Sequence, residues 1–80
     1  MKLITEENYT ELINKLREEL LDLNGKILKI LNFQGTVEWH YLPSYQKHLL
    51  NIQVQAMKTY AEILNTRIDL IGYEIKEENK

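Results

Sequence analysis

The residues of this chain best suited to bind a ligand are Gln53, Tyr60 and Arg67, which lie seven residues apart in one predicted helix. We call these three residues the polar row. At about 100° per residue they line up along the helix, between the apolar rows that begin at Leu49 and Leu50. A guanidinium among apolar side chains needs an anion or a hydrogen-bond acceptor. Tyr60 adds a stacking face or a hydroxyl, and Gln53 adds an amide suited to a base or a sugar.

Two interpretations of the polar row stay open. In the first, the row lines a pocket between subunits, where Arg67 clamps an anionic group through paired hydrogen bonds. In the second, the row is structural, and Arg67 pairs with an acid of another helix to fix its register. The candidate acids are Glu18, Glu19 and Asp22.

Further candidate residues lie near the end of the first predicted helix and in the segment that follows it. Lys26 and Lys29 either add positive charge to an anion pocket or only complement the helix dipole. Trp39, His40 and Tyr45 form an aromatic group that is suited to stacking on a planar ligand. Stacking of a base on an aromatic ring is worth about 1–3 kcal/mol. The alternative for Trp39 is that it plugs the open end of the fold.

The same residues give no indication of catalysis. The one serine, Ser44, lies in a predicted helix cap, the chain has no cysteine, and no glycine-rich phosphate loop is present. His40 and His48 are eight residues apart, which is not the spacing of a metal-binding pair on a helix. We therefore expect a protein that is not an enzyme and has neither a metal nor a cofactor.

Composition and charge narrow the class of partner. Eighty residues, 44% hydrophobic and 28% charged, are typical of one folded domain. A net charge of −2 argues against binding of a DNA or RNA polymer but not against a small anion. The N-terminus lacks the apolar run of a signal peptide, and no apolar segment reaches the length of a membrane span. We expect a cytoplasmic protein without membrane contact.

The elements that position these residues are two long helices. Apolar spacing predicts a first helix over residues 5–32, a hinge over 33–42, a second helix over 43–77 and a polar tail. Thr5 is the expected cap of the first helix. The apolar phase passes unbroken through Gly25, which indicates one continuous helix that is bent or closely packed there.

The hinge has its own local signals. Thr36 is placed to cap a short helical turn that contains Trp39. Pro43 suits the first turn of the second helix, with Ser44 as the alternative cap. The sequence therefore predicts an all-α helical hairpin of two long antiparallel helices joined by an aromatic hinge, all within one domain, 1–80.

The apolar arcs of both helices are wider than a hairpin can cover. A helix that is apolar around most of its circumference needs neighbours on several sides, and an 80-residue chain has little core of its own. Because most soluble assemblies are symmetric homo-oligomers, we expect a homo-oligomeric bundle.

The pattern Leu42-Pro43, Gln53, Tyr60 and Arg67 resembles small all-helical accessory proteins of tailed bacteriophages, including crAss-like phages. The first half is a weaker match. The resemblance implies a phage origin and a role inside an infected bacterium. In architecture the chain is more loosely similar to phage anti-defence sponges, which sequester cyclic oligonucleotides or ADP-ribose derivatives. No residue is carried over from those sponges.

These observations favour a phage anti-defence protein that binds and sequesters a nucleotide-type immune signal in pockets between subunits. Arg67, with Lys26 or Lys29, is expected to hold the phosphates, and Tyr60 with Trp39 the base. The alternative is a non-catalytic helical protein that docks on a host or phage protein.

Overall fold

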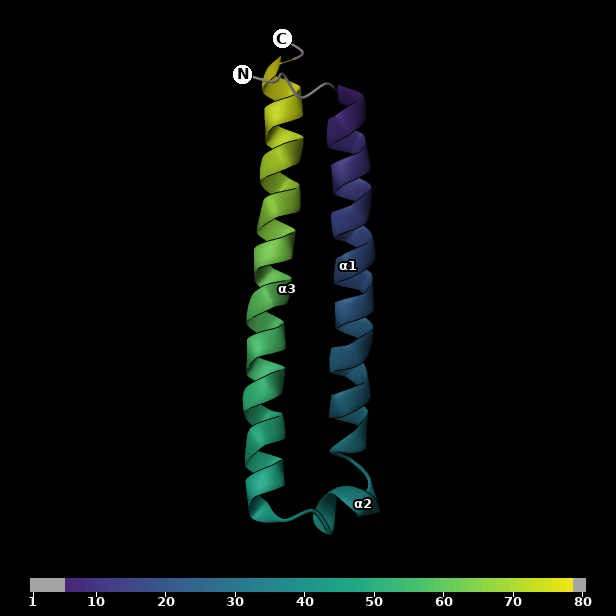
Figure 1. The fold of residues 1–80 in the computed structure, drawn as a ribbon, viewed down its shortest axis with the longest axis vertical. Coiled ribbons are helices and arrows are strands. Elements are labelled where there is room, and N and C mark those ends of the chain that lie inside the picture. Colours follow the sequence, from purple (N-terminus) through teal and green to yellow (C-terminus); the bar gives the residue numbers. More distant parts are fainter. Residues whose placement is uncertain (1–5, 79–80) are drawn as a thin grey trace.

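Two long helices lie side by side in the computed structural model, which describes the backbone of residues 6–78 and the side chains of residues 8–73 (Figure 1). Helix α1 spans Glu6–Phe33, the short α2 spans Val37–His40, and α3 spans Ser44–Glu78. The fold is all-α, as predicted, and the helix bounds fall within one residue of those expected. Thr5 and the end of the polar tail, residues 79–80, lie outside the described residues.

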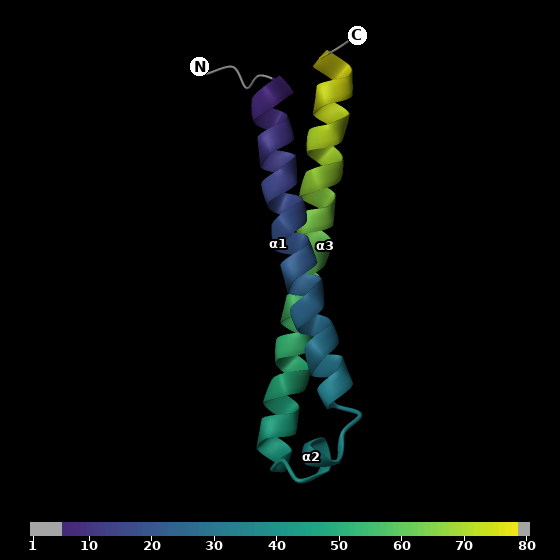
Figure 2. The same ribbon diagram turned by 90° about the vertical axis from the view of Figure 1, so that its right-hand side faces the viewer.

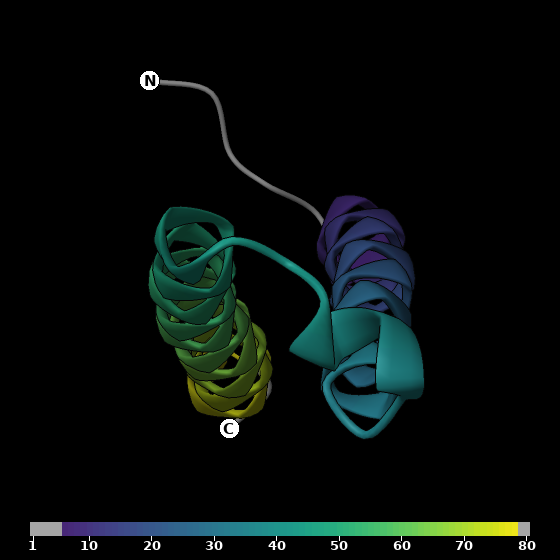
Figure 3. The same cartoon turned by 90° about the horizontal axis from the view of Figure 1, so that it is seen from below.

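The hairpin is long and thin, with extents of 57 × 19 × 17 Å. The two long helices cross at a shallow angle (Figure 2). Helix α2 lies beneath the end of α1 (Figure 3).

One apolar seam holds α1 and α3 together. Its buried residues recur every three, four or seven positions, the spacing that places side chains on one face of a helix. They are Tyr9, Leu16, Leu23 and Ile27 of α1, and Val54, Ala61 and Leu64 of α3. Partly buried side chains at Leu20, Ile30, Met57, Ile68 and Ile71 widen the seam. In the sequence, apolar residues alternate four and three positions apart from Tyr9 to Ile30, which predicts this inward face of α1, and the structure confirms it.

The hinge is closed by local contacts. Thr36 caps α2 by accepting a hydrogen bond from the Trp39 backbone N–H at 3.4 Å, as predicted, and its hydroxyl donates to the Phe33 carbonyl at 2.6 Å. At the start of α3, the Pro43 carbonyl accepts from the N–H groups of Gln46 and Lys47. Pro43 is therefore the capping residue, and Ser44 is the first helical residue. The prediction that Pro43 lies in the first turn is therefore wrong by one residue, and the alternative of Ser44 as the cap is wrong as well.

Gly25 lies inside α1 without interrupting it, and a Cβ atom added there would meet no atom within 4 Å. The expectation of close packing at Gly25 is therefore wrong within one hairpin. Gly25→Ala is expected to stabilise the protein by about 0.5–1 kcal/mol, because alanine loses less backbone freedom in a helix. The melting temperature should rise by several degrees. A lower melting temperature would show that another subunit packs against Gly25 itself.

Candidate functional site

The polar row lies along one side of the hairpin, at the edge of the buried seam. Gln53, Tyr60 and Arg67 are all exposed, whereas Leu64 beside them is fully buried and Leu50 is half-buried. As predicted, the row runs between two apolar rows. The hairpin covers only one of them, because α1 packs along one side of α3.

The second of these rows is uncovered. It consists of Leu49, Ala56, Ile63 and Leu70, and we call it the apolar strip. Leu49, Ile63 and Leu70 are 55%, 50% and 57% exposed. Exposed apolar patches are typical of interaction surfaces, so the apolar strip is a candidate contact with another molecule.

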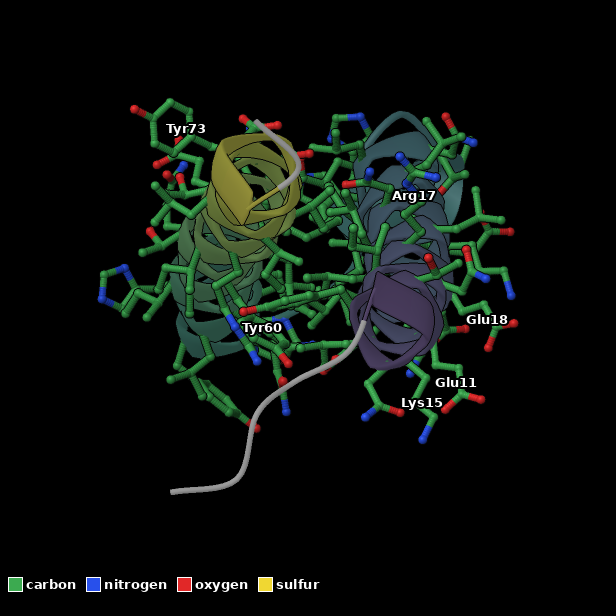
Figure 4. The ribbon with its side chains drawn as sticks, turned by 90° about the horizontal axis from the view of Figure 1, so that it is seen from above. Glu11, Lys15, Arg17, Glu18, Tyr60 and Tyr73 are labelled. Carbon is green, nitrogen blue, oxygen red and sulfur yellow. The ribbon has the colours of Figure 1, made fainter. Side chains whose placement is uncertain are left out.

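Tyr60 is the residue of the polar row that contacts α1. Its hydroxyl donates a hydrogen bond to the carboxylate of Glu19. Figure 4 shows the side chain reaching from α3 across to α1. Glu19, one of the acids expected to pair with Arg67, is therefore engaged by Tyr60 instead.

The Tyr60–Glu19 contact also shows which residues of α1 and α3 lie at the same height along the hairpin axis. We call such residues level with one another. Because the helices are antiparallel, a step of seven residues along α3 corresponds to seven residues back along α1. Arg67 is therefore level with Leu12, and Gln53 is level with Lys26. Side chains of one hairpin can share a site only if they lie at nearby levels along its axis.

Arg67 has no partner among the side chains of residues 8–73. It makes no hydrogen bond or ion pair with the residues that the structure describes. The predicted acids lie six to ten residues beyond Leu12 in α1, about 9–15 Å along the axis. Glu18 points away from α3 altogether (Figure 4). These acids therefore do not pair with Arg67 within the described part of one hairpin, and both interpretations, a ligand clamp and a structural pair between subunits, stay open.

Gln53 and Lys26 have only weak local contacts. The Gln53 amide nitrogen lies 3.9 Å from the Met57 sulfur. Lys26 pairs with Asp22 at 3.1 Å, one helical turn away, and both side chains are exposed. Exposed pairs of this kind contribute 0–1 kcal/mol, so Lys26 is available to an anionic ligand at little cost.

Lys26 and Lys29 line the same shallow hollow on the outer surface of α1, with a volume of about 420 Å³. Gly25 and Leu21 line it as well, together with two acids, Glu18 and Asp22. The structure thus brings the two lysines together, as expected. The two acids offset their charge, so the hollow does not form an anion site on its own.

Trp39, His40 and Tyr45 lie at the hinge end, apart from the polar row. The Trp39 ring meets Phe33 edge-on at 6.1 Å, and the Lys47 ammonium lies 6.0 Å from the Trp39 ring centre. Lys47 also donates to the His40 carbonyl at 3.4 Å. These contacts favour the interpretation of Trp39 as a plug of the hinge, whereas Tyr45 is 63% exposed.

A single hairpin therefore does not bring the expected site residues together. Lys47, which contacts Trp39, precedes Tyr60 by thirteen residues, or about 20 Å along α3. Arg67 lies fourteen residues, about 21 Å, from the level of Lys26. The expectation of a pocket between subunits stays a prediction.

A second hollow, of about 310 Å³, lies on the opposite side of the hairpin from Tyr60 (Figure 4). The residues that line it are Ile13, Arg17, Ile68, Asp69, Gly72 and Tyr73. Sequence reasoning did not identify Arg17 or Asp69, because their proximity depends on the register of α1 against α3. Heptad spacing within either helix carries no signal for it.

The described residues were also compared with the requirements of a metal site and of a membrane span. They contain no group of three His, Asp or Glu side chains placed to hold a metal ion. Over the same residues, neither long helix has a segment apolar enough to cross a membrane.

Comparison with known proteins gives one match. The sequence model of a family described as Sequestin matches residues 10–70, which include both long helices, the hinge and the whole polar row. Neither a curated protein nor a solved structure matches the chain. The family's name denotes sequestration, which agrees in broad terms with the function expected from the sequence.

Proposed function

The chain belongs to the Sequestin family, and from that membership we propose that it binds and sequesters a small nucleotide-type immune signal in pockets between its subunits. The observation that carries the proposal is the exposed Arg67 guanidinium, which has no partner among the described residues. It lies in one row with Tyr60 and Gln53, beside an apolar strip that a second subunit can cover.

The chemistry of the polar row suits such a ligand. A planar guanidinium binds a phosphate through two parallel hydrogen bonds. The Tyr60 ring offers a face for a base, and the Gln53 amide both donates and accepts hydrogen bonds. A cyclic oligonucleotide or an ADP-ribose derivative carries phosphates, bases and sugars within reach of a row that spans about 21 Å.

Sequestration needs tight binding without turnover. We propose that the protein is not an enzyme and that it removes the signal by holding it unchanged. The resemblance to phage accessory proteins supports an anti-defence role in the cytoplasm of an infected bacterium, where such messengers act.

The experiment that tests this function is ligand binding to the purified protein. We expect cyclic di-AMP, cyclic tri-AMP or ADP-ribose to raise the melting temperature and to give a calorimetric binding signal, because a ligand that binds only the folded state stabilises it. The bound nucleotide should be recovered chemically unchanged after denaturation. If none of the three binds to a well-folded oligomer, the proposal is wrong.

A second candidate function is supported by the apolar strip. In this alternative the strip docks on a host or phage protein, and the polar row lies at the edge of the contact without binding a ligand. Substitution of Arg67, described in the Discussion, separates the two functions.

A further inference from the structure

The four residues of the apolar strip form a nearly symmetric pattern about the midpoint of the strip. Its midpoint falls between Thr59 and Tyr60. When the strip is reversed end to end, Leu49 meets Leu70 and Ala56 meets Ile63. Each end of the strip then pairs two leucines, and in the middle the small Ala56 side chain faces the larger, β-branched Ile63.

We propose that the apolar strip packs against the strip of a second copy of this chain, antiparallel, with a two-fold axis at the level of Tyr60. We propose further that the ligand site is completed across this contact, by Arg67 of one copy and by the partner's Gln53 and Lys26. The second statement rests on the proposed function, whereas the pairing stands without it.

Steric fit and the placement of the polar rows favour antiparallel over parallel pairing. In a parallel pair, each residue of the strip would meet its own copy, so Ala56 would face the partner's Ala56 and leave a gap. The two polar rows would also lie on opposite edges of the contact, so that they would share no site. In the antiparallel pair Arg67 instead meets the neutral amide of the partner's Gln53. A two-fold contact also buries the same surface on both copies, so no apolar strip remains open.

The composite site follows from the levels within the hairpin. Arg67 and Gln53 lie equally far from Tyr60, seven residues on either side. A two-fold axis at the midpoint of the strip, between Thr59 and Tyr60, therefore places Arg67 within one residue of the level of the partner's Gln53. Since Gln53 is itself level with Lys26, the partner's Lys26 reaches the same region.

The polar row borders the apolar strip on the side that faces α1 (Figure 4). When the strips pair, the two polar rows therefore form the floor of a channel between the two α1 helices. Each dimer has two equivalent sites. At each of them two like charges, Arg67 and the partner's Lys26, approach one another, and this arrangement favours an anion between them.

Cross-linking tests the pairing directly, because the natural chain has no cysteine. A mixture of Ala56→Cys and Ile63→Cys proteins should form a disulfide-linked dimer that contains one chain of each, and neither variant alone should cross-link. Gln55→Cys mixed with Glu62→Cys is the matched control. These two positions are also seven residues apart but lie on an exposed face of α3 away from the apolar strip, so they should stay unlinked. Self-linking of each variant would show a parallel pair, and absence of any link would show that the strip does not self-associate; either result overturns the pairing.

Mixed dimers test the composite site. Neither an Arg67→Met dimer nor a Lys26→Met dimer contains an intact site. A dimer with one chain of each variant, isolated through two different affinity tags, has one intact site and one that lacks both cations. We expect calorimetry with the three nucleotide probes to give one binding event per mixed dimer at the affinity of the unaltered protein, against two per unaltered dimer.

The possible outcomes separate the pairing from the function. If Arg67 and Lys26 acted within one chain, the mixed dimer would recover no binding, and the composite site would be wrong. If the cysteine variants cross-link as expected but no probe binds to the unaltered protein, the proposed function and the composite site fail while the pairing stands.

Discussion

Arg67→Met is expected to weaken nucleotide binding by about tenfold to a hundredfold while the oligomer stays assembled. A hydrogen bond to a charged group contributes about 1.5–3 kcal/mol, and each 1.4 kcal/mol corresponds to a factor of ten in affinity. Methionine keeps much of the apolar stem of arginine but cannot bind a phosphate. The measurement is calorimetry with the nucleotide that binds the unaltered protein, together with light scattering to follow the mass.

Arg17→Met is the matched control, because Arg17 is also exposed and lies on the opposite side of the hairpin from Tyr60 (Figure 4). It should leave binding unchanged. A second variant, Arg67→Lys, keeps the charge but loses the planar fork, and we expect it to recover only part of the affinity. If Arg67 instead forms a structural pair between subunits, Arg67→Met will leave binding intact and will be tolerated or even stabilising.

Ile63→Glu is expected to dissociate the oligomer. Ile63 lies near the middle of the apolar strip and is 50% exposed in the hairpin, so the substitution is compatible with one folded chain. In an assembled dimer it would bury an unpaired carboxylate on each side of the two-fold axis, at a cost of several kcal/mol. Light scattering should show the mass fall to the 9.6 kDa of a single chain.

Gln55→Glu is the control for this effect, since it places the same charge on the solvated face of α3. It should leave the mass unchanged. Circular dichroism of Ile63→Glu shows whether the separated hairpin stays helical, because a single seam gives an 80-residue chain limited stability. Ile63→Glu protein that keeps the mass of the unaltered oligomer would contradict assembly through the apolar strip.

Much of the fold could be predicted because each helix carries its own pattern. The face of α1 that contains Leu16 and Leu23 is read from spacing alone, and the same spacing continues through Gly25. The Thr36 cap was predictable because capping depends on neighbouring residues only. The predicted start of α3 was wrong by one residue because both Pro43 and Ser44 suit the start of a helix, and the choice between them depends on the path of the chain through the hinge.

The candidate site was harder to predict, because it depends on the register between two helices. Nothing in the spacing of α3 indicates that Tyr60 is level with Glu19. Because this register cannot be read from the sequence, Arg67 and Lys26 were expected in one pocket, although about 21 Å separates them along one hairpin. The sequence did indicate that the polar row is flanked by an uncovered apolar surface, since only one neighbouring helix is available to each arm.

Native mass spectrometry of the protein with bound nucleotide tests the central claim most directly, because one spectrum reports both the assembly and the state of the ligand. We expect a dimer of the 9.6 kDa chain, or a multiple of it, that carries intact nucleotide in a ratio of up to two per dimer. A monomer, or an assembled protein that takes up none of cyclic di-AMP, cyclic tri-AMP and ADP-ribose, would contradict sequestration between subunits.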